Sequence, residues 1–174
     1  PTLKVLEERM AVLEGGAASV AFASGMAAIS SVLMSLLKMG DEVVAHRVLY
    51  GSAWNFIKNI LPRYGVRSRL VDLTSTSDLA DQISERTKVV YVETPVNPSL
   101  EVIDIAAVCD IARARGAKVV VDNTFATPFF QRPLELGADV VVHSATKYIS
   151  GHGDVIAGIA VARDEDYAGE LKFG

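Results

Sequence analysis

Short apolar runs of strand length alternate along the chain with segments whose apolar residues recur about every 3.6 positions. The runs predict strands at residues 19–23, 42–46, 68–73, 88–93, 117–122, 138–143 and 155–162. The periodic segments predict helices at residues 3–13, 25–37, 52–61, 78–85 and 104–115, and a further helical pattern begins in DEDYAGELKFG. The interior strands are continuously apolar, which is typical of a sheet covered on both faces. The pattern therefore predicts an α/β fold with a mostly parallel sheet and helices on both of its faces.

Two of the predicted helices have features that bear on packing. Pro62 is expected to end the helix at residues 52–61, because proline lacks the amide hydrogen that a helix interior needs. The first helix places four apolar residues on one face: Leu3, Leu6, Met10 and Leu13. That face suits either an internal core contact or a contact with another subunit.

Composition and charge narrow the possible partners. The 174 residues are 50% hydrophobic and 22% charged, which is enough apolar material for one well-packed domain or a large part of one. The net charge is -4 and no basic stripe is present, so we expect no nucleic-acid partner. Charged or small residues interrupt every apolar segment before it could span a bilayer, so we expect no membrane partner.

The single cysteine, Cys109, cannot form an internal disulfide, and it falls on the apolar side of a predicted helix. We expect a small buried hydrophobe there and a reducing, cytoplasmic environment. The chain begins with Pro1 and ends within a helical pattern. We therefore expect it to be a fragment of a longer polypeptide.

Polar and aromatic residues follow the predicted strands, where ligands gather in open parallel sheets. Ser24 suits a helix cap, and the free amides of Gly25 and Met26 would face an anion. The later strands are followed by the aromatic ring of Tyr50, the amide of Asn97 in a proline-rich turn and the carboxylate of Asp122. The last of them is followed by the hydroxyls of Ser144 and Thr146 and the amine of Lys147. Together these groups match the needs of pyridoxal phosphate, which has an aldehyde, a phosphate, a flat ring and a pyridine nitrogen.

Each feature alone has a simpler interpretation. Asp122 could form a turn, Lys147 could be a solvated surface lysine, and Tyr50 could be core packing. Three histidines, His46, His143 and His152, lack the spacing of metal ligands, so we expect structural roles and no metal site. The Gly-rich dinucleotide motif, the Walker sequence and G-x-S-x-G do not occur. The prediction therefore depends on the combination.

The motifs SGMAAI, LYG, ETPVNPSLEVIDI, VVVDNTFATP and QRPLELGADVVVHSATKYISGHGD closely resemble, in this order, the Cys/Met-metabolism family of pyridoxal-phosphate enzymes. This family has fold type I, and its members include methionine γ-lyase, cystathionine γ-lyase, cystathionine γ-synthase and the O-acylhomoserine sulfhydrylases. The resemblance extends over essentially the whole chain. It implies a pyridoxal-phosphate-binding large domain at residues 1–174, with an N-terminal arm and a C-terminal small domain outside the chain.

The resemblance also implies roles for individual residues. Lys147 matches the Schiff-base lysine, and Asp122 matches the carboxylate that faces the pyridine nitrogen. Tyr50 matches the tyrosine that stacks on the ring, and it is the candidate proton donor to the leaving group. The remaining matches are to phosphate binders, namely Gly25, Met26, Ser144 and Thr146. Asn97 and Thr124 match positions near the 3'-oxygen of the cofactor and the substrate.

The reaction stays open between two classes within the family. The resemblance implies γ-elimination on a sulfur amino acid, as in methionine γ-lyase or cystathionine γ-lyase. The alternative is γ-replacement on an acylated homoserine, because well-known methionine γ-lyases carry cysteine where this chain has Ser52. A non-catalytic nucleotide-binding or interaction module on the same fold is the hypothesis outside this class. The family also implies a homo-oligomer, a dimer of dimers.

Overall fold

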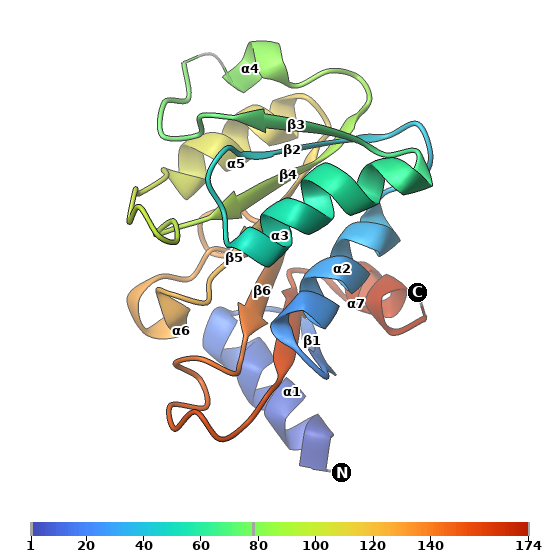
Figure 1. The fold of residues 1–174 in the computed structure, drawn as a ribbon. Coiled ribbons are helices and arrows are strands. Elements are labelled where there is room, and N and C mark those ends of the chain that lie inside the picture. The colour runs from blue at the N-terminus through green and yellow to red at the C-terminus, as the bar shows by residue number, and fades with distance from the viewer. Residues whose placement is uncertain (1, 78, 174) are drawn as a thin grey trace.

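A computed structural model describes residues 2–77 and 79–173, so Pro1, Asp78 and Gly174 lie outside the described residues. It contains a seven-stranded sheet with the order β1-β7-β6-β5-β4-β2-β3 (Figure 1). The strands are β1 (Ala18–Phe22), β2 (Glu42–His46), β3 (Arg67–Val71), β4 (Thr87–Glu93), β5 (Lys118–Asp122), β6 (Val140–Ser144) and β7 (Gly158–Ala162). Strands β3, β2, β4, β5 and β6 pair in parallel, and β7 is antiparallel to both β6 and β1. The predicted α/β fold with a mostly parallel sheet is confirmed.

Helices cover both faces of this sheet (Figure 1). They are α1 (Thr2–Glu14), α2 (Gly25–Leu36), α3 (Gly51–Asn55), α4 (Leu79–Gln82), α5 (Ile105–Ala114), α6 (Thr127–Phe130) and α7 (Glu165–Phe173). One apolar core joins the sheet to α1, α4 and α5, and the other joins it to α2, α3 and α7. Cys109 is buried in α5, as predicted, and burial raises the pKa of its thiol to about 12. In the described ranges, no helix combines the length and apolar character needed to cross a bilayer.

Alternation along the strands decides which side chains reach which face. Val120 of β5 belongs to the core under α2, and Val121 belongs to the core under α1. Because side chains alternate with a period of two, Asp122 continues the α2 face and Asn123 continues the α1 face. The same alternation in β6 puts Ser144 on the α2 face and His143 on the α1 face. The polar residues after these strands therefore divide into two groups.

Two local predictions need correction, and one short helix was not predicted. Pro62 does not end the helix: α3 continues as a π-helical turn (Phe56–Ile60) and then a 3-10 turn (Leu61–Tyr64). The missing amide hydrogen is accommodated by this change of helical pitch. The last strand begins at Gly158 and not at residue 155, because Ala157 is hydrogen-bonded to Thr146 in a preceding loop. The short helix α6 was not predicted from the sequence.

The buried face of α1 also differs from the predicted apolar face. Met10 is buried, but Leu3 and Leu13 are exposed. The side that faces the sheet carries Glu7 and Glu14, because both carboxylates accept hydrogen bonds inside the protein. The exposed apolar residues of α1 are therefore available for a contact outside this chain.

Candidate active site

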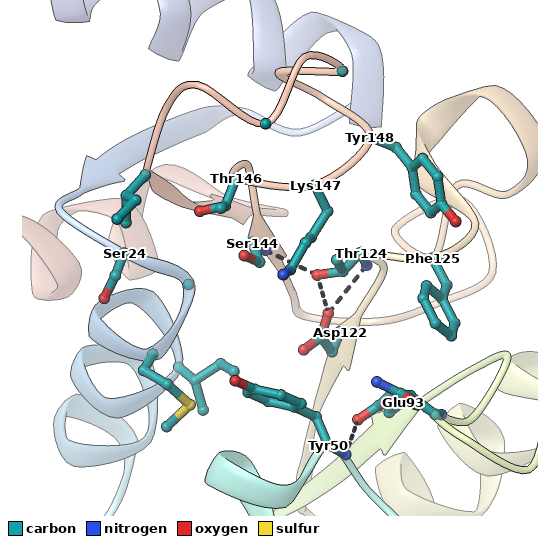
Figure 2. Close-up of a pocket in the computed structure, with 17 residues that line it drawn as sticks. Ser24, Tyr50, Glu93, Asp122, Thr124, Phe125, Ser144, Thr146, Lys147 and Tyr148 are labelled. Atoms are coloured by element: carbon teal, nitrogen blue, oxygen red, sulfur yellow. Dashed lines mark hydrogen bonds between the residues drawn. The ribbon is translucent and has the colours of Figure 1, made fainter.

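A cavity of about 650 Å³ lies at the carboxyl ends of the parallel strands, beside the N-terminus of α2 (Figure 2). All nine residues that the sequence singled out line it: Gly25, Met26, Tyr50, Asn97, Asp122, Thr124, Ser144, Thr146 and Lys147. They come together because β2, β4, β5 and β6 are parallel, so their carboxyl ends share one edge of the sheet.

The N-terminus of α2 approaches the end of β6 closely. Ser24 caps this helix, and its hydroxyl oxygen accepts a hydrogen bond from the amide of Ala27 at 3.1 Å. Helix geometry leaves the amides of Gly25 and Met26 without intrahelical acceptors. A Cβ atom on Gly25 would lie 2.6 Å from the Cβ of Ser144, so only glycine permits this approach. The free amides and the Ser144 hydroxyl thus form one region suited to an anion.

Asp122 is held from both sides at the end of β5. Its Oδ1 accepts hydrogen bonds from the amide of Thr124 at 3.0 Å and from the hydroxyl of Thr124 at 2.5 Å. Its Oδ2 accepts a hydrogen bond from the buried hydroxyl of Tyr91 at 3.2 Å. Burial and the neighbouring Asp122 raise the pKa of Tyr91 well above its ordinary value, so the phenol remains a donor. The orientation of the carboxylate is therefore fixed before any ligand binds.

Lys147 lies in the series of tight turns that follows β6. Its backbone amide donates to the carbonyl oxygen of Ser144 at 3.1 Å. Figure 2 shows the amine of Lys147 and the carboxylate of Asp122 directed into the same cavity, with the ring of Tyr50 at its border. The side chain of Lys147 is exposed in this chain. An amine and a carboxylate therefore face one solvent-accessible space.

Thr146 has a more local role than the sequence suggested. Its hydroxyl donates to the carbonyl oxygen of Ala157 at 3.2 Å and accepts from the amide of Ala157 at 3.1 Å. These bonds close the loop between β6 and β7. Gly151 and Gly153 lie in that loop with φ angles of 74° and 71°, a conformation that favours glycine. For Thr146 to contact a ligand, its hydroxyl would have to exchange one of these partners.

Sequence reasoning missed Glu93 at the end of β4. This side chain lines the cavity and is buried, and its two oxygens accept hydrogen bonds from the amides of Tyr50 and Asn97. Burial and the neighbouring Asp122 raise the pKa of Glu93 to about 7. The available signal was an acidic residue that closes an apolar strand at the ligand-binding edge. Phe125 and Tyr148 also line the cavity and were not predicted.

A second polar group lies on the α1 face, directly behind the cavity. Glu14 Oε1 accepts hydrogen bonds from His143 Nε2 at 2.5 Å and from Asn123 Nδ2 at 2.8 Å. The amide of Gln131 in turn donates to Asn123 Oδ1 at 2.8 Å. His46 Nδ1 separately accepts from the amide of Leu73 at 3.0 Å, so His46 and His143 have the structural roles expected from the sequence. Asn123 and His143 each adjoin residues that line the cavity.

Comparison with known proteins agrees with this geometry. The family model for Cys/Met metabolism PLP-dependent enzymes matches residues 1–174. The chain belongs to this family. Pyridoxal 5'-phosphate (PLP) is therefore the cofactor to test against the cavity.

Individual relatives of the family are also similar over nearly the whole chain. An L-methionine gamma-lyase from Pseudomonas putida is 55% identical over 92% of the chain, and a cystathionine gamma-lyase from Bacillus subtilis is 45% identical over 99% of it. The crystal structure of metB from Corynebacterium glutamicum superposes with a TM-score of 0.97 at 43% identity over 99% of the chain. The chain spans only 40 to 45% of the length of these proteins.

The cavity fits PLP by the chemistry of its groups. It offers an amine, a carboxylate fixed at a separate point, an aromatic ring and an anion-binding helix terminus. The close approach of Gly25 to Ser144 leaves backbone amides and a hydroxyl side by side, as a phosphate requires. Family membership and geometry therefore point to the same cofactor.

Proposed function

We propose that the protein containing this chain catalyses PLP-dependent γ-elimination on a sulfur amino acid, methionine or cystathionine. The observation that carries the proposal is the placement of Lys147, Asp122 and the N-terminus of α2 around one cavity. The relatives named L-methionine gamma-lyase and cystathionine gamma-lyase support the choice of reaction.

Four sets of groups in the chain would hold the cofactor. The amine of Lys147 would bond to its aldehyde, and the carboxylate of Asp122 would pair with its pyridine nitrogen. The amides of Gly25 and Met26 and the hydroxyls of Ser144 and Thr146 would receive the phosphate. Asn97 and Thr124 would lie near the 3'-oxygen and the substrate. When bound, the cofactor supplies a carbonyl for the substrate amine and a ring that accepts electron density from the α-carbon.

The residues of the chain would then move protons. Once its amine is free, Lys147 would take a proton from the α-carbon of the substrate and move a second at the β-carbon. Asp122, held by Thr124 and Tyr91, would keep the positive charge on the ring nitrogen. Tyr50 is about half exposed at the border of the cavity, where its ring can stack and its hydroxyl can protonate the departing sulfur.

γ-Replacement on an acylated homoserine is the second candidate. One observation favours it: Ser52, in α3 and near Tyr50, stands where a cysteine is expected for methionine elimination. Both reactions use the same amine and carboxylate. They differ in whether a thiol acceptor enters the cavity.

We further propose a homo-oligomeric protein, a dimer of dimers, in the cytoplasm. Large apolar side chains are exposed on α1 and α6, among them Leu3, Val12, Phe129 and Phe130. Such surfaces commonly mark protein contacts. The single buried Cys109 is compatible with a reducing compartment.

Cofactor binding is tested with the full-length protein. We expect the purified protein to be yellow. After borohydride reduction, peptide mapping should find PLP covalently attached to Lys147, and Lys147→Ala should lose the colour on dialysis. Lys58→Ala, a change in the π-helical turn Phe56–Ile60 outside the cavity, should remain yellow. A wild-type protein that stays colourless after PLP is added would favour a non-catalytic binding module.

The reaction class is tested by product analysis. Methionine and cystathionine should each be supplied without an acceptor, and acylated homoserine should be supplied with sulfide or cysteine. The proposal expects 2-oxobutanoate from a sulfur amino acid alone. A thioether or thiol product from acylated homoserine, with no 2-oxobutanoate from methionine or cystathionine, would support γ-replacement instead.

A further inference from the structure

Glu93 is a buried carboxyl group in the cavity whose partners are backbone amides. It ends β4 and is only 6% exposed. Within residues 2–77 and 79–173 it forms no ion pair with a lysine, arginine or histidine. A buried carboxylate without a cationic partner is costly, so its presence requires an explanation.

The two oxygens of Glu93 are shared between two loops. Oε2 accepts a hydrogen bond from the amide of Tyr50 at 2.7 Å, and Oε1 accepts one from the amide of Asn97 at 2.9 Å. Tyr50 lies between β2 and α3, whereas Asn97 lies in the turn after β4. One side chain therefore joins two segments that are 43 and 4 residues away from it in the sequence.

Both amides belong to residues that line the cavity, as Figure 2 shows for Glu93 and Tyr50. Moving the amide of Tyr50 would move its ring, since the ring is attached two bonds from the same Cα atom. We propose that Glu93 is a positioning residue, whose charged carboxylate sets the ring of Tyr50 and the side chain of Asn97 at the cavity by holding one backbone amide of each. The inference rests on the proposed function only for its kinetic readout.

The charge state of Glu93 changes near neutral pH. Burial and the neighbouring Asp122, its register partner on β5, raise the pKa of Glu93 from 4.5 to about 7, against the lowering effect of the two amides. The other ionisable groups around it are the phenol of Tyr91 on the same strand, the phenol of Tyr50 and the amine of Lys147 across the cavity. Protonation would convert one acceptor oxygen to a hydroxyl, which weakens one of the two amide bonds.

Protonation of Glu93 has opposite effects on the two properties: it favours the folded state but weakens the bonds that position Tyr50 and Asn97. Because the folded-state pKa is higher than the ordinary value, the folded chain binds this proton more tightly than the unfolded chain. The contribution of Glu93 to stability is therefore complete below pH 4.5 and is lost as the pH rises to about 7. The positioning bonds strengthen as the folded chain loses this proton, around pH 7. A group that only stabilised the fold would not show this opposition.

The test compares Glu93→Gln with wild type between about pH 5.5 and 8.5. Glutamine keeps one acceptor oxygen, and its NH₂ group cannot accept from the second amide. In wild type we expect kcat/KM and the visible circular dichroism of bound PLP to rise with a midpoint near 7. In Glu93→Gln the rise with a midpoint near 7 should be lost from both, with kcat/KM about tenfold below the alkaline plateau of wild type.

Two further variants separate positioning from folding. Glu93→Asp keeps the charge on a shorter side chain, so it should retain the pH dependence with a lower plateau. Glu101→Gln removes a carboxylate that pairs with Arg47 outside the cavity and should leave the pH dependence intact. The proposal is wrong if the rise near pH 7 persists in Glu93→Gln or is absent from wild type.

A measurement without cofactor distinguishes this failure from failure of the proposed function. In cofactor-free protein at alkaline pH, hydrogen exchange followed by mass spectrometry reports on the amides of Tyr50 and Asn97. Glu93→Gln should accelerate exchange of at least one of them, while the helix α5 exchanges as in wild type. Unchanged exchange at both amides would overturn the positioning role even if the protein proves to be a PLP enzyme.

Discussion

Asp122 and Thr124 are joined twice, because the amide and the hydroxyl of Thr124 both donate to the same carboxylate oxygen, at 3.0 and 2.5 Å. The Thr124 hydroxyl oxygen also accepts from the amide of Ser144 at 2.8 Å. One side chain thus fixes the carboxylate at the end of β5 and the backbone at the end of β6. The proposed nitrogen-pairing and phosphate-binding regions therefore have a fixed spacing.

Replacing Thr124 tests this coupling. Thr124→Val keeps the shape but removes the hydroxyl, which leaves the Ser144 amide without its acceptor. We expect a loss of about 1–3 kcal/mol in the free energy of unfolding and weaker retention of PLP on dialysis. Thr124→Ser keeps the hydroxyl and should stay close to wild type. Equal urea midpoints and equal PLP retention in the two variants would contradict the coupling.

Asp122→Asn tests the charge of the carboxylate at constant shape. The new amide can still accept from Thr124, and the Tyr91 hydroxyl can turn to accept from its NH₂ group. We therefore expect a folded, yellow protein whose kcat falls by about 10²–10³-fold. Asp110→Asn, on the exposed side of α5, is the matched control and should leave kcat unchanged. Retention of wild-type kcat by Asp122→Asn would remove the carboxylate from the proposed chemistry.

Gly25→Ala tests the close approach of α2 to β6. The added Cβ would lie 2.6 Å from Ser144 Cβ and 2.9 Å from its Cα, so the helix or the strand end must shift. We expect destabilisation of about 1–3 kcal/mol and weaker PLP binding. Gly51 is the first residue of α3, and a Cβ atom added there would have no neighbour within 4 Å. Gly51→Ala should therefore be neutral or slightly stabilising. Thermal unfolding and PLP titration of both variants provide the comparison, and similar behaviour of the two would refute the steric argument.

The strand ends could be predicted from the sequence because parallel strands carry their apolar residues in continuous runs. Once the runs at residues 42–46, 88–93, 117–122 and 138–143 were placed in parallel, the residues after them had to share one edge. This is why seven of the nine predicted residues line one cavity, which Gly25 and Met26 reach from the end of β1. The antiparallel direction of β7 could not be predicted in the same way, because an apolar run has no direction of its own.

The missed features depend on contacts between distant residues. The apolar face predicted for the first helix did not include Glu14, whose carboxylate has hydrogen-bond partners 109 and 129 residues away. Glu93 was overlooked for a similar reason, since its role depends on the meeting of two loops. The periodic pattern identifies apolar residues that face the core. It does not identify buried acidic residues, because these depend on hydrogen-bond partners that only the tertiary structure brings close.

The group formed by Glu14, His143 and Asn123 should be cooperative. Glu14 and His143 are both fully buried and hydrogen-bonded to each other. Glu14 Oε1 also accepts a hydrogen bond from the side-chain amide of Asn123. Glu14→Leu would leave the His143 N–H and one Asn123 donor without acceptors, at a cost of about 3–5 kcal/mol. His143→Leu should likewise be destabilising, since it leaves the carboxylate buried with one donor fewer. Urea unfolding at fixed pH measures both losses.

The double variant provides the decisive comparison. Glu14→Leu with His143→Leu removes both partners together, so less unsatisfied polar surface remains than the two single variants produce separately. We therefore expect the double variant to lose clearly less stability than the sum of the single losses. Additive losses would mean that the two side chains stabilise α1 and β6 independently. Since His143 directly precedes Ser144, coupling would show that α1 is tied to β6 next to a residue that lines the cavity.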